Sequence, residues 1–258
     1  MMSTTPTAEE LSTRFAGKSL YDVLHYALHA FGDGLRIASS MGVEDMVVLH
    51  EADRAGKSLG RRPQVFLLDT GRLHQETYDL VDRVRQRYDV QLNIYAPQTD
   101  ALERLLREKG PNSFYASIED RKACCGIRKV EPLGRALADA EAWVTGLRRD
   151  QASTRADVHI FEPDDGHRSR KGAPLLKVNP LAAWTSEDVW QFVKENDIPT
   201  HELHARGYPS IGCAPCTRAV QPGEDPRAGR WWWEDAAQKE CGLHSPKHLA
   251  ALAARKGT

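Results

Sequence analysis

Val65-Phe66-Leu67-Leu68-Asp69-Thr70-Gly71 is the stretch of sequence that indicates the fold most directly. Its apolar residues follow one another without polar alternation, which is typical of a short strand that is covered on both faces. The apolar run stops at Asp69, and polar or small residues follow it. The stretch therefore predicts an inner strand of a mostly parallel sheet, with a polar turn where the strand ends.

Predicted strands and helices alternate on either side of this stretch. Apolar spacing predicts helices over residues 20–31, 44–52, 76–88 and 100–109. Further strands are predicted over residues 35–40, 90–95, 142–145 and 175–178. Thr185 is expected to cap another helix, with Asp188 at the third helical position. This alternation favours an α/β fold, a mostly parallel twisted sheet with helices on both faces.

The alternation ends near Pro199, so the sequence predicts two parts. Residues 1–198 are expected to form an α/β domain that binds a nucleotide. Residues 199–258 are expected to form a C-terminal appendage that ends in a mobile tail. Residues 163–172 and 222–230 have the composition of loops.

The composition is that of an ordinary globular protein, with 35 basic and 36 acidic residues among 258. A net charge near zero produces no strong field toward nucleic acid or an anionic membrane, so neither is expected as a partner. No apolar run is long enough to cross a bilayer, and residues 1–6 lead into no secretory signal. A cytoplasmic enzyme is expected, in a compartment that keeps thiols reduced.

Polar residues follow three of the predicted strands. They are Ser39-Ser40, Asp69-Thr70-Gly71 and Thr145-Gly146-Leu147-Arg148-Arg149. Ligands bind beyond the C-terminal ends of the strands in such sheets, so these segments are candidate ligand contacts. The first turn suits a phosphate, because hydroxyls lie beside the N–H groups of a helix start. An ordinary helix cap is the other interpretation of the first two segments.

Four of the five cysteines come in two pairs, Cys124-Cys125 and Cys213-Ala-Pro-Cys216. Basic residues flank the first pair: Arg121, Lys122, Arg128 and Lys129. Adjacent side chains tend to diverge, so they fit a single tetrahedral zinc ion poorly. A four-iron cluster suits them better, because each thiolate binds a different iron. Zinc stays open as an alternative.

The fifth cysteine, Cys241, lies near the C-terminus in Glu240-Cys241-Gly242-Leu243-His244. As a nucleophile it would need nearby cations to lower its pKa. Arg227, Arg230 and His244 are the local candidates, and the alternative is a tail cysteine without a role. Residues 231–233 are three tryptophans, which could dock the segment while the two arginines bind an anion.

These motifs together resemble the bacterial iron–sulfur assimilatory adenylylsulfate reductases, relatives of phosphoadenylylsulfate reductase. The matching segments are residues 68–74, 124–133, 145–151, 213–217, 227–234 and 240–244. The resemblance implies an adenine nucleotide alpha-hydrolase-like fold. It also implies a [4Fe-4S] cluster on four residues: Cys124, Cys125, Cys213 and Cys216.

The same resemblance implies a two-step reaction. Cys241 attacks the sulfur of adenylylsulfate, AMP leaves, and thioredoxin then releases sulfite from the S-sulfonated cysteine. The residues implied to contact the substrate, beside the strand-end residues, are Lys129, Gly146, Arg148 or Arg149, Arg227, Arg230 and His244. One departure is the turn Ser39–Asp45, which lacks the Ser-Gly-Gly-x-Asp-Ser pattern of the ATP-cleaving members of this fold.

Three other functions stay open at this point. A phosphoadenylylsulfate reductase with the same cluster would need an additional pocket for the 3′-phosphate. A tRNA-thiolating enzyme is disfavoured by the near-neutral charge and the altered phosphate turn. A zinc-stabilised nucleotide-binding module is the non-enzyme alternative. The sequence leaves the choice between a monomer and a homo-oligomer open.

Overall fold

The computed structural model describes residues 6–152, 155–169 and 172–234 of the chain. The chain divides into two compact units. The first comprises Met1–Phe66, Leu80–Asn93 and Leu137–Thr200. The second comprises Leu67–Asp79, Ile94–Ala136 and His201–Thr258. The chain thus passes between the units several times, and the division into residues 1–198 and 199–258 stays a prediction.

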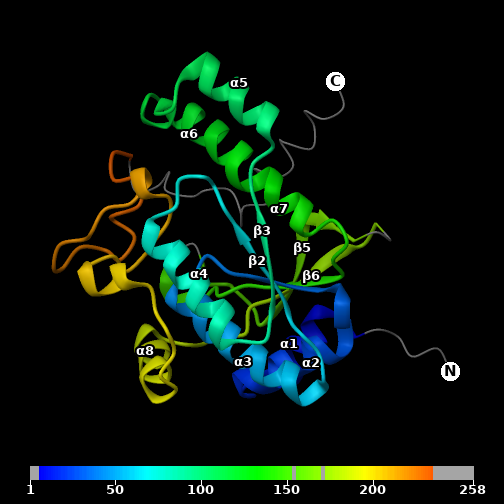
Figure 1. The fold of residues 1–258 in the computed structure, drawn as a ribbon. Helices are drawn as coiled ribbons and strands as arrows, with labels where there is room; N and C mark the ends of the chain where they lie inside the picture. Colours follow the sequence, from blue (N-terminus) through cyan, green and yellow to red (C-terminus); the bar gives the residue numbers. More distant parts are fainter. Residues whose placement is uncertain (1–5, 153–154, 170–171, 235–258) are drawn as a thin grey trace. The chain divides into compact units, whose positions relative to one another are not determined.

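A six-stranded sheet has the order β3-β2-β1-β4-β6-β5 (Figure 1). Its strands are β1 (Leu35–Ala38), β2 (Gln64–Leu68), β3 (Gln91–Tyr95), β4 (Ala142–Val144), β5 (Phe161–Arg168) and β6 (Pro174–Val178). Strand β1 pairs in parallel with β2 and β4, and β4 pairs in parallel with β6. Strand β5 pairs antiparallel with β6. The predicted mostly parallel α/β sheet is confirmed.

The centre of the sheet is a row of branched apolar side chains. Ile37 lies between Val65 on β2 and Val144 on β4, and Val144 in turn lies beside Val178 on β6. All four side chains are almost fully buried. Each contributes about 1.5–3 kcal/mol by leaving water. This row explains why the apolar run around Val65 predicted a strand covered on both faces.

Eight α-helices are described. They are α1 (Ala8–Phe15), α2 (Leu20–Phe31), α3 (Val43–Leu59), α4 (Gln75–Arg87), α5 (Thr99–Lys109), α6 (Ile118–Cys125), α7 (Glu131–Ala136) and α8 (Ser186–Glu195). All four helices predicted from apolar spacing are present, and α3 continues to Leu59. The predicted cap is confirmed, because Thr185 and Asp188 form a capping box at the start of α8. No helix among the described residues is both long enough and apolar enough to cross a bilayer.

Helix α3 is buried on several sides, with Met46, Val47, Val48 and Leu49 inaccessible to water. It packs against α2 and α8 in the first unit. This packing holds the first turn of α3, which carries Glu44 and Asp45, directly after the turn that leaves β1.

One sequence prediction is wrong. Residues 163–172 were expected to form a loop, but residues 163–168 belong to strand β5. The strand lies at the edge of the sheet and pairs only with β6 in the strand order. Pro163 is tolerated there because an edge strand can leave one side of its backbone unpaired. The Pro, Asp and Gly content therefore misled the interpretation.

Candidate functional site

The turn after β1 is held by its own carboxylate. Backbone N and side-chain Oγ of Ser40 both donate to Oδ2 of Asp45, at 2.6 and 2.7 Å. Ser39 is buried, and its backbone N donates to the carbonyl of Phe66. Burial raises the pKa of Asp45 to about 6, although the hydrogen bonds from Ser40 oppose this shift. In this structure an internal acid therefore engages the donors that the sequence assigned to a phosphate.

Gly146, in the loop after β4, lies against the first turn of α3. A Cβ atom at this position would lie 2.5 Å from Oδ1 of Asp45 and 3.0 Å from Cβ of Glu44. The first distance is shorter than Cβ atoms show in proteins and the second is at the tight limit, so any other residue here would displace Asp45, and the close approach of the two strand-end segments favours glycine. Thr145, which precedes Gly146, is buried and donates to Asn179 at 2.6 Å.

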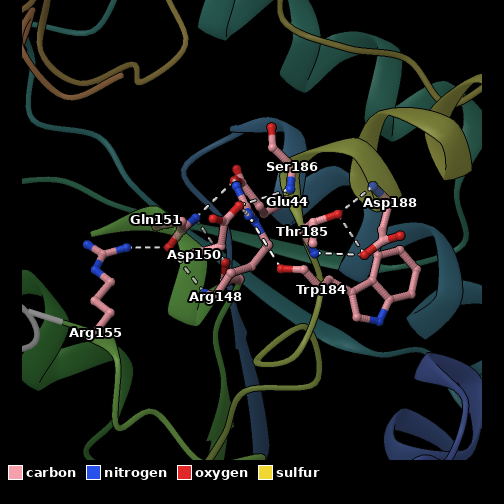
Figure 2. A network of polar contacts seen from close by, with 10 residues as sticks. Glu44, Arg148, Asp150, Gln151, Arg155, Trp184, Thr185, Ser186 and Asp188 are labelled. Atoms are coloured by element: carbon pink, nitrogen blue, oxygen red, sulfur yellow. Dashed lines mark hydrogen bonds and ion pairs between the residues drawn. The ribbon is translucent and has the colours of Figure 1, made fainter. Parts of the chain in front are cut away.

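The two neighbouring arginines of this loop differ in their surroundings. Arg148 is only 5% exposed, and its guanidinium pairs with Glu44 and Asp150, both at 2.9 Å (Figure 2). Arg149 is exposed, and its Nε donates to the carbonyl of Val158 at 2.8 Å. Of the two residues, Arg148 has its charge compensated by carboxylates inside the first unit.

In the second unit, the turn after β2 is linked to a cysteine. Thr70 is fully buried, and its Oγ1 lies 3.2 Å from Sγ of Cys213. Asp69 accepts from the backbone N of Gly71 and from the hydroxyl of Tyr78, both at 2.8 Å. Burial and this carboxylate raise the pKa of Tyr78 to about 12. The turn therefore holds the Thr70 hydroxyl within hydrogen-bond distance of the Cys213 thiol, a role that the sequence did not indicate.

The two cysteine pairs both belong to the second unit. Cys124 and Cys125 end helix α6, and a π-helix over Gly126–Val130 follows them and carries Arg128 and Lys129. Cys213 precedes a short 3₁₀ helix, Ala214–Cys216, that ends at the fourth cysteine. The backbone N of Ala214 donates to the carbonyl of Arg72 at 2.8 Å, which anchors the second pair.

The thiols and the neighbouring cations influence one another. Burial alone would raise the pKa of Cys213, but Lys129, the Thr70 hydroxyl, Arg230 and Arg128 lower it overall. Burial and then the charge of Cys213 raise the pKa of Cys216 to about 12. Burial also raises the pKa of Cys124, while Arg128 opposes this shift through its charge and a hydrogen bond. Basic residues therefore favour the thiolate form of each of these three cysteines, and they outweigh burial only at Cys213.

A second set of observations concerns donors near these sulfurs. Within the described residues, Nε of Arg128 and Nε1 of Trp231 are buried and have no hydrogen-bond partner. Buried donors are usually paired, so these two indicate room for an acceptor. In the same part of the chain, no three His, Cys, Asp or Glu side chains converge as ligands of one ion. A four-iron cluster does not require such convergence, because each thiolate binds a different iron. The donor set therefore fits a group of this kind.

The arginine and tryptophan segment is fastened within the second unit. Arg121 and Glu234 form a buried, two-pronged ion pair at 2.9 and 2.8 Å. Trp231 is fully buried, and the guanidiniums of Arg121 and Arg230 both lie 4.8 Å from its ring. The expected docking by tryptophan thus involves Trp231, and Trp232 is half exposed.

The remaining predicted residues are distributed as follows. Arg230 is buried and donates to Oγ of Ser210 at 3.3 Å, and Arg227 is half-buried. Cys241 and His244 lie outside the described residues. Sequence reasoning missed the Arg121–Glu234 pair and the role of Glu44. For the Arg121–Glu234 pair, the position of Arg121 beside the cysteines was the available signal in the sequence.

The sheet and the gathered thiols define an α/β protein with a sulfur-rich candidate site. Residues 34–219 match the family model described as the phosphoadenosine phosphosulfate reductase domain. This match covers more than half of the chain, so the protein belongs to that family.

Similar proteins agree with this assignment. The chain is 51% identical over 241 residues to the adenosine 5′-phosphosulfate reductase of Burkholderia cepacia, covering 93% of this chain and 92% of the relative. It is 49% identical to the enzyme of the same name from Pseudomonas aeruginosa strain LESB58, covering 91% and 85%. The crystal structure of phosphoadenylyl-sulfate reductase from Candida auris superposes with a TM-score of 0.66 at 27% identity, covering 84% of this chain and all of that one.

Proposed function

We propose that this protein is an assimilatory adenylylsulfate reductase, which converts adenylylsulfate to sulfite and AMP. The observation that carries the proposal is the set of four thiols gathered in one unit beside Arg128, Lys129 and Arg230. Family membership and the names of the bacterial relatives support the same activity. A reaction on a sulfate group requires cations that neutralise its oxygens, and this region supplies them.

We assign the four paired cysteines to a [4Fe-4S] cluster, held by Cys124, Cys125, Cys213 and Cys216. When bound, such a cluster supplies a fixed, polarisable charge beside the basic residues. Thr70 would orient Cys213, and Arg128 would compensate the charge of Cys124. Arg128 also donates to the carbonyl of Thr70 at 2.5 Å, which couples the two cysteine pairs.

The proposed chemistry begins on Cys241. Its thiolate attacks the sulfur of adenylylsulfate, and the bond between that sulfur and the phosphate oxygen breaks. AMP leaves with the bonding electrons, and the cysteine carries an S-sulfonate. Lys129, Arg227, Arg230 and His244 are the proposed cationic or donor contacts to the anion. They would withdraw charge from oxygens that otherwise repel a thiolate.

The proposed second step needs a dithiol reductant of the thioredoxin class. One of its thiolates attacks the Cys241 sulfur, and sulfite leaves with the electron pair of the S–S bond. The second thiol of the reductant resolves the mixed disulfide and restores Cys241 as a thiol. Two thiols are thereby oxidised to a disulfide while the sulfur is reduced from sulfate to sulfite level. A cytoplasmic location, which supplies reduced thiols, is part of this proposal.

The nearest alternative is reduction of phosphoadenylylsulfate, the nucleotide in the family description and in the name of the Candida auris enzyme. The bacterial relatives near 50% identity carry the other nucleotide in their names, which favours adenylylsulfate. Strand-end residues stay proposed nucleotide contacts: Ser39, Ser40, Asp69, Thr70, Gly71, Gly146 and Arg149.

The test is turnover of the purified holoprotein with thioredoxin and each nucleotide in turn. We expect sulfite release with a kcat/KM for adenylylsulfate at least a hundredfold above that for phosphoadenylylsulfate. Iron and zinc contents and the visible spectrum of the same sample separate an iron–sulfur cluster from a zinc ion. Sulfite from phosphoadenylylsulfate alone would support the alternative, and sulfite from neither nucleotide would contradict both.

A further inference from the structure

We infer that Glu44 is a positioning residue for the nucleotide, because it holds the loop after β4 in one arrangement through Arg148 and Gln151. The inference rests on the proposed function in one respect, namely that an adenine nucleotide is the ligand. It concerns the first unit only. Glu44 itself is expected to touch neither the sulfate nor the reacting cysteine.

The side chain of Glu44 gathers three donors on one oxygen (Figure 2). Oε1 accepts from Nη2 and Nε of Arg148, at 2.9 and 3.2 Å. It also accepts from Nε2 of Gln151 at 2.9 Å. The side chains of Arg148 and Glu44 are 6% and 18% exposed, so solvent screens this pair weakly. One oxygen on the first turn of α3 thus fastens two residues of the loop.

Gln151 extends the connection further along the loop. Its amide oxygen accepts from the backbone N of Arg148 at 3.2 Å and from the guanidinium of Arg155. Its amide nitrogen faces Glu44 and the carbonyl of Gly146. A carboxylate on one side and a guanidinium on the other permit only one orientation of the amide. A continuous chain of hydrogen bonds therefore runs from Glu44 through Gln151 to Arg155.

Arg148 connects the same loop to a third element. Nη1 donates to Asp150 at 2.9 Å and to the carbonyl of Trp184 at 3.4 Å. Asp150 in turn accepts from the backbone N of Ser186 at 3.1 Å, at the start of α8. Arg148 thus lies between two carboxylates and serves as a scaffold.

The arrangement matters because the loop follows a parallel strand at its carboxyl end, where ligands bind in sheets of this kind. Gly146 already brings the loop within van der Waals distance of α3. Without Glu44 the loop would become ordered only when the nucleotide binds. The free-energy cost of that ordering would then reduce the affinity for the nucleotide. We therefore expect affinity to fall while the rate of the bound complex changes little.

The test is AMP binding by titration calorimetry on the full-length holoprotein. Glu44→Ala should weaken AMP about tenfold and raise KM for adenylylsulfate by a similar factor, with kcat within about twofold. Glu44→Gln keeps an accepting oxygen at the same distance along the side chain, so its affinity should stay within about twofold of the original protein. Glu187→Ala is the matched control, since Glu187 is an exposed glutamate in the first turn of α8.

Two results would overturn the inference. One is unchanged AMP affinity in Glu44→Ala. The other is an equal loss in Glu44→Gln, which would show that the negative charge acts and not the position of the oxygen. If Glu44→Ala does not fold, Gln151→Met removes the connection to Arg155 and leaves the Glu44–Arg148 pair intact. Wild-type affinity in Gln151→Met would overturn the inference as well.

The same experiment separates this inference from the proposed function. AMP binding requires no turnover, so the Ala and Gln variants can be ranked even if adenylylsulfate is not reduced. Thermal unfolding and the visible spectrum show whether a variant merely unfolds. Loss of AMP affinity with an unchanged melting temperature and spectrum is the expected signature of positioning.

Discussion

Two buried arginines in the two units have opposite surroundings. Arg148 lies between the carboxylates of Glu44 and Asp150, and these two ion pairs compensate its charge. Arg128 lies beside the cysteines, donates to a backbone carbonyl, and keeps a buried Nε without a hydrogen-bond partner among the described residues. The comparison teaches that burial of an arginine alone does not mark a ligand contact. A buried arginine with an unpaired donor is a better indicator of a ligand contact, because an unpaired buried donor lowers the stability of the fold unless a ligand accepts from it.

The largest expected effect concerns the proposed nucleophile. Cys241→Ser should reduce sulfite formation by at least about a thousandfold, because a hydroxyl is a far weaker nucleophile than a thiolate. AMP binding and the visible spectrum should be unchanged. Sulfite release and calorimetry on one preparation measure all three quantities. Normal turnover by the variant would contradict the assignment of the nucleophile.

Removing the unfilled donor should sharpen the comparison. Arg128→Leu should lower iron content or activity about 10- to 100-fold, the usual effect of losing a partner of the metal ligands. Arg148→Leu should leave the iron content unchanged and act on stability and nucleotide affinity. Iron per protein is the measurement. Equal iron loss in both variants would show that the two surroundings do not differ in function.

Breaking the paired arginine of the second unit should act on folding. Glu234→Ala removes the carboxylate that pairs with the buried Arg121. The side chains of Arg121 and Glu234 are only 1% and 4% exposed, so water cannot replace the lost partner. We expect a loss of about 3–5 kcal/mol in the free energy of unfolding. Urea denaturation measures this free energy. Glu224→Ala is the control, because it breaks a more exposed ion pair with Arg218. It should cost at most about 1 kcal/mol. A similar loss in both variants would be the contrary result.

The smallest expected effect depends on pH. The pKa of Asp45 is raised from 3.8 to about 6 by burial, so the folded state holds its proton more tightly than the unfolded state does. The stability from this group is therefore fully present below pH 4 and is lost as the pH rises through 6. Asp45→Asn should avoid this loss and gain about 3 kcal/mol at pH 8 relative to pH 4. Denaturation across this range checks it, and a pH-independent difference would contradict the assignment.

Much of the fold followed from local pattern, because apolar runs such as the one around Val65 and the capping signal at Thr185 depend on neighbouring residues. The edge strand β5 could not be predicted in this way, because Pro163 and Gly166 are residue types that are typical of loops. The cysteine pairs were recognisable by spacing. The contacts of Thr70 with Cys213 and of Glu44 with Arg148 join positions far apart in the chain, and no local pattern encodes them.

The central claim is that Cys241 carries the sulfonate, and mass spectrometry tests it most directly. The holoprotein is incubated with adenylylsulfate in the absence of thioredoxin, and the intact protein and its peptides are then weighed. We predict one added SO₃ group, located on the peptide that contains Cys241 and removed by thioredoxin. An unmodified Cys241 peptide after AMP has been released, or the group on another cysteine, would contradict the account.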